Sequence, residues 1–233
     1  MGTRIALTHS SGRLRGLEPA LVARGYDVVR NPLIETVPLL DGETRDRARG
    51  LLSCPWLLFT SPAAVAAWRK LNLPFRGISS KIGVVGDKTA ATVQRYGGRV
   101  ALVADPPTAV GLADTFLTTY PGVHHVGLPQ GNRAKPTLQQ HLEASGVQTR
   151  SVVVYKTETL PWRAGDAEVV VLASPSAFKA LPDDVAKRAT LVAIGPTTAA
   201  AIRQQGLTPV VAARPSVAAL LDTIDDLFVS EGE

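Results

Sequence analysis

Short apolar runs alternate along the chain with segments in which apolar residues recur at helical spacing. The runs Trp56–Thr60 and Val169–Ala173 are almost entirely apolar, as expected for strands buried on both faces. Each run is followed by Ser-Pro and an alanine-rich stretch, and serine N-caps with proline in the first turn favour a helix start. A further helix is predicted over Leu14–Arg24, closed by Gly25. The pattern predicts an α/β protein with parallel sheets and helices on both faces.

The pattern also occurs twice in the same order. Three motifs of the first half return in the second half at a nearly constant spacing. They are TSPAA, VGDKTAA and VADPP at residues 60–64, 85–91 and 103–107, matched by ASPSA, IGPTTAA and VAARP at residues 173–177, 194–200 and 211–215. A repeat of this length has the size of a small α/β domain. Because small-molecule sites often lie between domains, the repeat predicts two related lobes with a ligand-binding cleft between them.

Two further matched segments, Pro32–Pro38 and Tyr155–Pro161, each follow a strand-like run and end at a proline. Neither carries a helical pattern, and both are interpreted as extended connectors. No low-complexity linker separates the two halves, and Tyr120-Pro121-Gly122 is the nearest approach to a break. The repeat by itself favours two consecutive domains.

Composition narrows the class of protein. The chain has 233 residues, of which 45% are apolar, and this is enough for a globular protein of two domains. No secretion signal or membrane-spanning stretch is evident, so a cytoplasmic location without membrane contact is expected. The only cysteine, Cys54, excludes an intramolecular disulfide and a cysteine-based metal cage. No metal site is expected.

The formal net charge of +5 is spread along the chain, and aromatic residues make up only 5%. Nucleic-acid binding favours a dense basic stripe or interleaved aromatic residues, so no nucleic-acid partner is expected. A polyanionic small molecule is at least as consistent with this charge. The sequence also lacks dinucleotide-binding glycines, a phosphate loop and a G-x-S-x-G turn.

What remains is a set of loops at the predicted carboxyl ends of strands, among them Gln130–Lys135, where open α/β sheets bind ligands. Helix N-termini in such loops can hold carboxylate or phosphate groups. The candidate binding residues are Arg13, Ser61, Gly86, Thr89, Arg133, Lys135, Ser174, Gly195 and Thr198. The structural alternative is that the serines act as N-caps, the glycines as tight turns and the basic residues as solvated surface. Tyr155 stands at a strand end, where a tyrosine is a packing residue or a proton donor.

Taken together, the motifs resemble the uroporphyrinogen-III synthase family over nearly the full length of the chain. The resemblance rests on FTSPAAV, VGDKTA, VVYKT, ASPSA, IGPTTA and GL at residues 59–65, 85–90, 153–157, 173–177, 194–199 and 206–207. Each motif is short, but their order, spacing and repetition are specific. The resemblance implies a cofactor-free lyase that cyclises and dehydrates hydroxymethylbilane, a linear polycarboxylate tetrapyrrole, to uroporphyrinogen III. Ring D is inverted during this reaction, in the cleft between the lobes.

The resemblance also implies roles for individual residues. Tyr155 would be the general acid for the departing hydroxyl group. Thr89, Ser174 and Thr198 match family positions that contact substrate carboxylates together with backbone N–H groups. Ser61 is added through its repeat relation to Ser174. The expected protein is a monomer that needs no cofactor and makes at most transient contact with the upstream deaminase.

The family further implies that the chain crosses between lobes and returns. Two flavodoxin- or Rossmann-like lobes with parallel sheets would be joined by a two-stranded antiparallel ladder. The crossings fall near residues 32–38 and 155–161, so the expected lobes are residues 1–35 with 160–233, and residues 36–159.

Two other functions are compatible with the pattern. The chain could be a non-catalytic two-lobed binding or sensor protein for a tetrapyrrole-like polyanion. It could also be a nucleotide-handling α/β enzyme, which the missing phosphate loops disfavour. Turnover of hydroxymethylbilane, with the product isomers resolved, distinguishes these functions.

Overall fold

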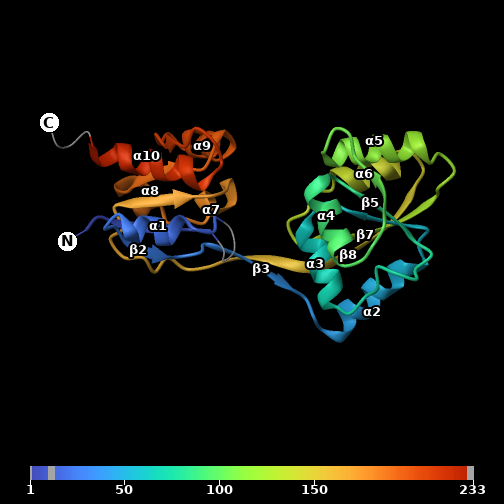
Figure 1. The fold of residues 1–233 in the computed structure, drawn as a ribbon. Coiled ribbons are helices and arrows are strands. Elements are labelled where there is room, and N and C mark those ends of the chain that lie inside the picture. Colours follow the sequence, from blue (N-terminus) through green and yellow to red (C-terminus); the bar gives the residue numbers. More distant parts are fainter. Residues whose placement is uncertain (1, 10–13, 230–233) are drawn as a thin grey trace. The chain divides into compact units, whose positions relative to one another are not determined.

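The computed structural model describes residues 2–9 and 14–229 and divides into two compact units (Figure 1). Unit 1 comprises Met1–Glu35 and Glu158–Glu233, and unit 2 comprises Thr36–Thr157. Each unit is a mixed α/β structure built around one sheet. No helix in the described part of the chain combines the length and the apolar character needed to cross a bilayer.

Unit 1 contains a parallel sheet in the order β11-β10-β9-β1-β2. Its strands are β1 (Arg4–Leu7), β2 (Asp27–Arg30), β9 (Val169–Leu172), β10 (Thr190–Ala193) and β11 (Val210–Val211). Its helices are α1 (Leu17–Ala23), α7 (Pro175–Lys179), α8 (Asp183–Arg188), α9 (Pro196–Arg203) and α10 (Val217–Val229).

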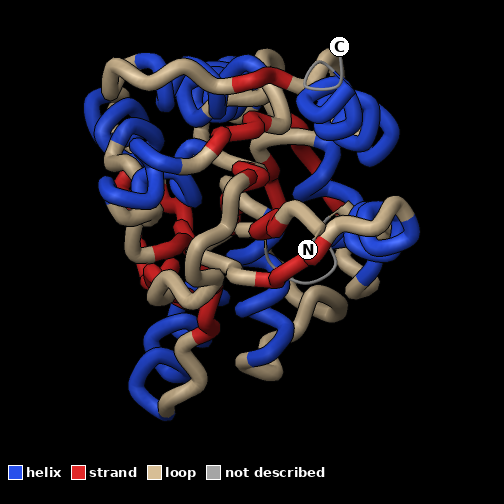
Figure 2. The backbone as a smooth tube through the Cα atoms, turned by 90° about the vertical axis from the view of Figure 1, so that its left-hand side faces the viewer, coloured by secondary structure: helices blue, strands red, loops and turns tan. Residues whose placement is uncertain are grey.

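Unit 2 contains a mostly parallel sheet in the order β3-β8-β7-β4-β5-β6. Its strands are β3 (Ile34–Pro38), β4 (Trp56–Phe59), β5 (Lys81–Val84), β6 (Val100–Val103), β7 (His125–Gly131) and β8 (Gln148–Thr159). Its helices are α2 (Gly42–Gly50), the short 3₁₀ helix η1 (Leu51–Ser53), α3 (Pro62–Lys70), α4 (Asp87–Arg95), α5 (Ala109–Thr119) and α6 (Thr137–Ala144). Figure 2 traces the alternation of strands and helices along the backbone.

Strands β3 and β8 pair in antiparallel fashion. The Leu39 N–H donates to the Val154 carbonyl, and the Leu160 N–H donates to the Leu33 carbonyl. Residue numbers therefore rise along one strand as they fall along the other, as in an antiparallel ladder. Both connectors predicted from the sequence thus lie in or beside extended strands, and the predicted fold class is confirmed.

The internal repeat of the sequence corresponds to a repeat of the strand order. The order β2-β1-β9-β10-β11 of unit 1, read from β2, corresponds to the order β8-β7-β4-β5-β6 of unit 2, read from β8. In each sheet the two strands from one half of the chain lie next to three strands from the other half. Strand β3 is the additional member of the second sheet.

The core residues alternate between the two faces of each sheet. In β4, Leu57 and Phe59 belong to the cluster packed under α3 and α4, whereas Trp56 and Leu58 belong to the cluster under α5 and α6. In β1, Ile5 and Leu7 pack with α1 and α10, and the residue between them, Ala6, faces α7 to α9. Burial on both faces explains why these strands are continuously apolar in sequence.

Local signals explain where the helices begin and end. The Ser61 Oγ accepts from the Ala64 N–H at 3.1 Å, and proline is the first residue of α3. Such an N-cap contributes about 0.5–2 kcal/mol. Gly25 follows α1 with φ +87°, and its N–H donates to the Val22 carbonyl. The predicted N-cap and closing glycine are confirmed.

Two predicted boundaries shift. Helix α1 begins at Leu17 rather than Leu14, because Leu14 and Gly16 both have positive φ, which a helix does not accept. Strand β7 continues through Gly131, where the sequence analysis placed a loop from Gln130, because this segment pairs with β8 up to Tyr155. Both shifts depend on backbone conformation or strand pairing. The spacing of apolar residues along the sequence gives no information on either.

Candidate active site

The loops at the carboxyl end of the sheet in unit 2 lie at one edge of that sheet. Parallel pairing sets Phe59 of β4 opposite Val84 of β5, and Gly131 of β7 opposite Tyr155 of β8. The residues that follow these strands, among them Ser61 and Gly86, therefore emerge at the same edge. This is the edge at which open α/β sheets bind ligands.

The Tyr155 side chain lies at this edge, opposite the end of β7, but β8 itself continues to Thr159, so the strand end predicted at Tyr155 is wrong. Its phenol oxygen lies 3.2 Å from the Ser61 Oγ, and either atom can be the donor. The ring is half-buried and packs against the core cluster that α3 and α4 cover. A hydroxyl group held in this way is fixed in position but still partly accessible.

Gly131 and Asn132 hold the other side of Tyr155. A Cβ atom at Gly131 would lie 2.3 Å from the Tyr155 Cζ and 2.6 Å from the phenol oxygen, so the ring occupies the space of a missing side chain. The Asn132 N–H donates to the Tyr155 carbonyl, and its Oδ1 accepts from the Thr157 N–H. The end of β7 and the first residue of the β7–α6 loop thus fix both the ring and the backbone of Tyr155.

The sequence analysis did not single out the contact between Gly131 and Tyr155. The only available signal was a glycine near the end of an apolar strand, which is compatible with many roles. The contact depends on the pairing of β7 with β8, whose register shifts between Gln130 and Gly131. Sequence periodicity alone does not give this register.

Ser61 and Ser174 are both N-caps, as the structural alternative held. The Ser174 Oγ accepts from the Ala177 N–H at 3.2 Å, in the same way that Ser61 caps α3. Ser61 has a second polar contact, the phenol of Tyr155. Capping and a role at the site are therefore compatible for Ser61.

Gly86 and Gly195 precede α4 and α9 in extended backbone, with φ 169° and 177°. Any residue adopts this conformation, so the short turns from strand to helix at these positions do not require glycine. A Cβ atom at Gly195 would meet nothing within 4 Å, and one at Gly86 would meet only the Pro107 Cβ, at 3.2 Å. The glycines leave the first turn of each helix uncovered by a side chain.

Thr89 and Thr198 occupy equivalent positions in the first turns of α4 and α9. They are 2% and 3% exposed. Within the described part of the chain, neither hydroxyl group forms a hydrogen bond with the protein. Because neither hydroxyl oxygen is itself fully buried, each hydroxyl group remains accessible to water or to a ligand.

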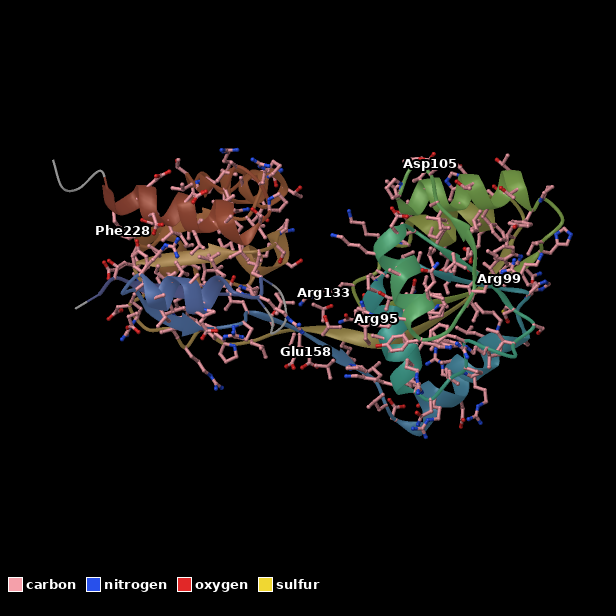
Figure 3. The ribbon with its side chains drawn as sticks, viewed as in Figure 1. Arg95, Arg99, Asp105, Arg133, Glu158 and Phe228 are labelled. Atoms are coloured by element: carbon pink, nitrogen blue, oxygen red, sulfur yellow. The ribbon has the colours of Figure 1, made fainter. Side chains whose placement is uncertain are left out.

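The structure describes two of the three basic candidates. Arg133, labelled in Figure 3, and Lys135 are exposed on the loop between β7 and α6, which follows Gly131 and Asn132 in the sequence. Arg13 lies outside the described residues. In unit 1, Ser174, Gly195 and Thr198 follow β9 and β10, whose parallel pairing brings them to the carboxyl edge of that sheet.

Other groups of the chain offer little chemistry. Among the described residues, no cluster of three or more His, Cys, Asp or Glu side chains is suited to a metal ion. Cys54 is buried, and this burial raises the pKa of its thiol, so it remains protonated at neutral pH and is a poor nucleophile. The candidate active-site residues can therefore supply proton donors and anion-binding groups.

Comparisons with known proteins agree with this arrangement. A family profile described as "Uroporphyrinogen-III synthase HemD" matches residues 16–222. A protein of Methanothermobacter thermautotrophicus named "Putative uroporphyrinogen-III synthase" is 31% identical over 202 residues, which cover 76% of this chain and 78% of that protein.

Solved structures share the fold. A mutant uroporphyrinogen III synthase of Thermus thermophilus has a TM-score of 0.70 at 18% identity, covering 98% of this chain and 100% of that one. The uroporphyrinogen-III synthetase of Helicobacter pylori has a TM-score of 0.61 at 19% identity, covering 97% of this chain and 99% of that one. At these identities the likeness concerns the fold.

Proposed function

Because the chain belongs to the uroporphyrinogen-III synthase family, we propose that it cyclises and dehydrates hydroxymethylbilane to uroporphyrinogen III with inversion of ring D. The observation that carries the proposal is the Tyr155 phenol, half-buried on β8 opposite the end of β7 and 3.2 Å from the Ser61 Oγ. It provides a proton donor in a fixed position at the edge of the sheet where ligands bind.

The reaction needs a proton and a fixed geometry. Protonation of the departing hydroxyl group on ring A releases water and leaves an azafulvene cation. Ring D attacks this carbon through its own substituted position, and the resulting spiro-pyrrolenine opens and recloses with ring D inverted. Without an enzyme the bilane closes to the uninverted isomer, so holding one conformation is the main catalytic task.

We assign the proton transfer to Tyr155 and its positioning to Ser61. If the Ser61 hydroxyl donates to the phenol oxygen, the phenol proton points away from the serine and toward the substrate. The same donor then stabilises the phenolate that remains after proton transfer. Gly131 keeps the ring in place because it leaves room for the phenol.

We assign the binding of the substrate carboxylates to the helix-start loops of both units. Gly86 and Gly195 leave the N–H groups in the first turns of α4 and α9 (after Pro196 in α9) uncovered by a side chain, and the positive end of a helix favours an anion. The Thr89 and Thr198 hydroxyl groups lie in the same turns, while Arg133 and Lys135 bring positive charge to the loop beside Tyr155. Ser174 is assigned the equivalent place at the start of α7.

The proposed enzyme is a cofactor-independent lyase that works as a monomer in the cytoplasm. Acid catalysis by a phenol and electrostatic binding of carboxylates require no redox or electrophilic cofactor. Transient contact with the deaminase that makes the unstable bilane would limit its spontaneous closure.

The direct test is turnover of freshly generated hydroxymethylbilane, with the type I and type III product isomers separated by chromatography. We expect the type III isomer with the protein and the type I isomer without it. Product identical to that of the protein-free reaction would contradict the proposal.

The general-acid role is tested with Tyr155→Phe. We expect kcat to fall by about 100-fold, the lower end of what acid–base catalysis contributes, with the circular dichroism spectrum unchanged. Full turnover by this variant would remove Tyr155 from the mechanism and leave the family reaction intact.

A further inference from the structure

A cavity lies at the amino-terminal edge of the sheet in unit 2. It has a volume of about 670 Å³ and is lined by the loop before β5, the start of β5, the segment between α4 and β6, and the residue that follows α5. Figure 3 labels Arg99 just before β6 and Asp105 just beyond its other end. Since Ser61 and Gly86 follow strands at the carboxyl edge, the cavity is separate from the candidate active site.

The lining of this cavity is basic. It includes Arg76, Lys81 and Arg99, and no aspartate or glutamate. None of the three cations forms an ion pair with a carboxylate within the part of the chain that the structure describes. Like charges at one cavity repel one another, so this arrangement is most favourable when an anion is bound.

Two of the three cations are held in place by the protein. The Arg76 Nε donates to the Gly97 carbonyl at 2.9 Å. A Cβ atom at Gly97 would lie 2.4 Å from that same Nε, so the guanidinium group rests where a side chain is missing. The Lys81 Nζ lies 5.7 Å from the Trp56 ring centroid and 5.3 Å from that of Tyr120. Both cations therefore lose little conformational freedom on binding a ligand.

The C-terminal end of α4 explains only part of this arrangement. A helix C-terminus attracts cations, and the bond from Arg76 to Gly97 satisfies one carbonyl just beyond α4. Four other N–H groups of the guanidinium remain. Within the described residues, the side chains of Lys81 and Arg99 form no hydrogen bond with this helix end, so helix capping does not account for their convergence.

We propose that this cavity binds a small multivalent anion, a molecule that carries two or more phosphate or carboxylate groups. The planar guanidinium groups of Arg76 and Arg99 match the geometry of either group in paired hydrogen bonds, and Lys81 adds a point charge. The volume lies within the range of small-molecule pockets, about 300–1,000 Å³. The site does not depend on the proposed reaction.

Isothermal titration calorimetry of the full chain tests this site, with inorganic pyrophosphate and citrate as the phosphate and carboxylate probes. At low ionic strength we expect at least one probe to bind, and Arg76→Gln/Arg99→Gln to weaken its binding by about tenfold or more. The matched control, Arg49→Gln/Arg203→Gln, removes the same charge from exposed positions on α2 and α9. It should weaken binding by less than about threefold.

Amide chemical shifts then locate the bound probe. We expect shifts at Gly97, Arg99 and Lys81, and their loss in the double variant. The proposal is overturned if neither probe binds, or if the control variant loses as much affinity as Arg76→Gln/Arg99→Gln. It is also overturned if the shifts appear only at Gly86, Thr89 and Ser61, because the anion then occupies the candidate active site.

Discussion

Tyr155 is the residue on which the proposed chemistry depends, and three neighbours determine its position. Ser61 contacts the phenol oxygen, Gly131 leaves space for the ring, and Asn132 holds the backbone. The sequence indicated Tyr155 and Ser61 as candidates, through a predicted strand end and a repeat. Their direct contact, between residues 94 positions apart, required the folded chain.

Gly131→Ala tests the importance of the ring position. The added methyl group would overlap the phenol, so the ring must move, and a displacement of about 1 Å can cost about 100-fold in rate. We expect kcat to fall by that order and the free energy of unfolding to fall by about 1–3 kcal/mol. Gly122→Ala, where a Cβ meets nothing within 4 Å, is the matched control. A kcat in Gly131→Ala equal to that of the control would show that turnover tolerates a displaced ring.

Ser61→Ala removes both the N-cap of α3 and the contact with Tyr155. We expect kcat to fall by about tenfold, from the loss of one hydrogen bond at the reacting group, and stability to fall by about 0.5–2 kcal/mol. Ser61→Thr keeps the hydroxyl and should restore both properties. A stability loss without any change in kcat or its pH profile would limit Ser61 to capping.

At the scale of the elements, local signals were the most informative. The two Ser-Pro starts, the closing Gly25 and the continuously apolar strands all follow from hydrogen bonds or burial within a few residues. The start of α1 and the end of β7 were less predictable. They depend on positive φ values at Leu14 and Gly16 and on pairing with β8.

Helix α2 offers a pH-dependent test at this scale. Asp41 caps it, with Oδ1 accepting from the Thr44 N–H at 2.8 Å and Oδ2 from the Thr44 hydroxyl at 2.9 Å. These bonds, the backbone bond first, lower the pKa of the Asp41 carboxyl below its ordinary value. The cap therefore stabilises the folded state above the unfolded pKa, about 3.9, and this contribution is lost as the pH falls through the lower folded pKa.

We expect Asp41→Ala to speed amide exchange in α2 at neutral pH, with the difference from the wild type shrinking in acid. Asp41→Asn keeps a capping oxygen without the charge, so its difference from Asp41→Ala should not depend on pH in this range. Hydrogen exchange at several pH values provides the measurement. A difference between wild type and Asp41→Ala that stays constant down to about pH 2 would contradict the role of the ionised carboxylate.

At the scale of the whole molecule, each unit has its own pair of core clusters. We propose that the two units are independently folded domains, each with two strands from one half of the chain and further strands from the other half. The chain enters unit 2 through β3 and leaves it through β8.

Leu21 and Leu142 test this proposal, since α1 joins β1 to β2, α6 joins the corresponding strands β7 and β8, and both leucines are 0% exposed. Replacing either by alanine should cost about 2–5 kcal/mol. We expect hydrogen exchange to accelerate in unit 1 for Leu21→Ala and in unit 2 for Leu142→Ala. Equal acceleration in both units for either variant would mean that the chain unfolds as a single cooperative body.

The sequence by itself determined the fold class, the alternation of strands and helices, and the family, because apolar periodicity, caps and repeated motifs are local properties of the chain. Only the tertiary structure decided which side chains meet. Strand register places Gly131 against Tyr155, and parallel pairing separates the carboxyl edge of unit 2 from the amino edge where Arg76, Lys81 and Arg99 surround a cavity. Such contacts join residues far apart in the sequence, and a one-residue change of register would abolish them.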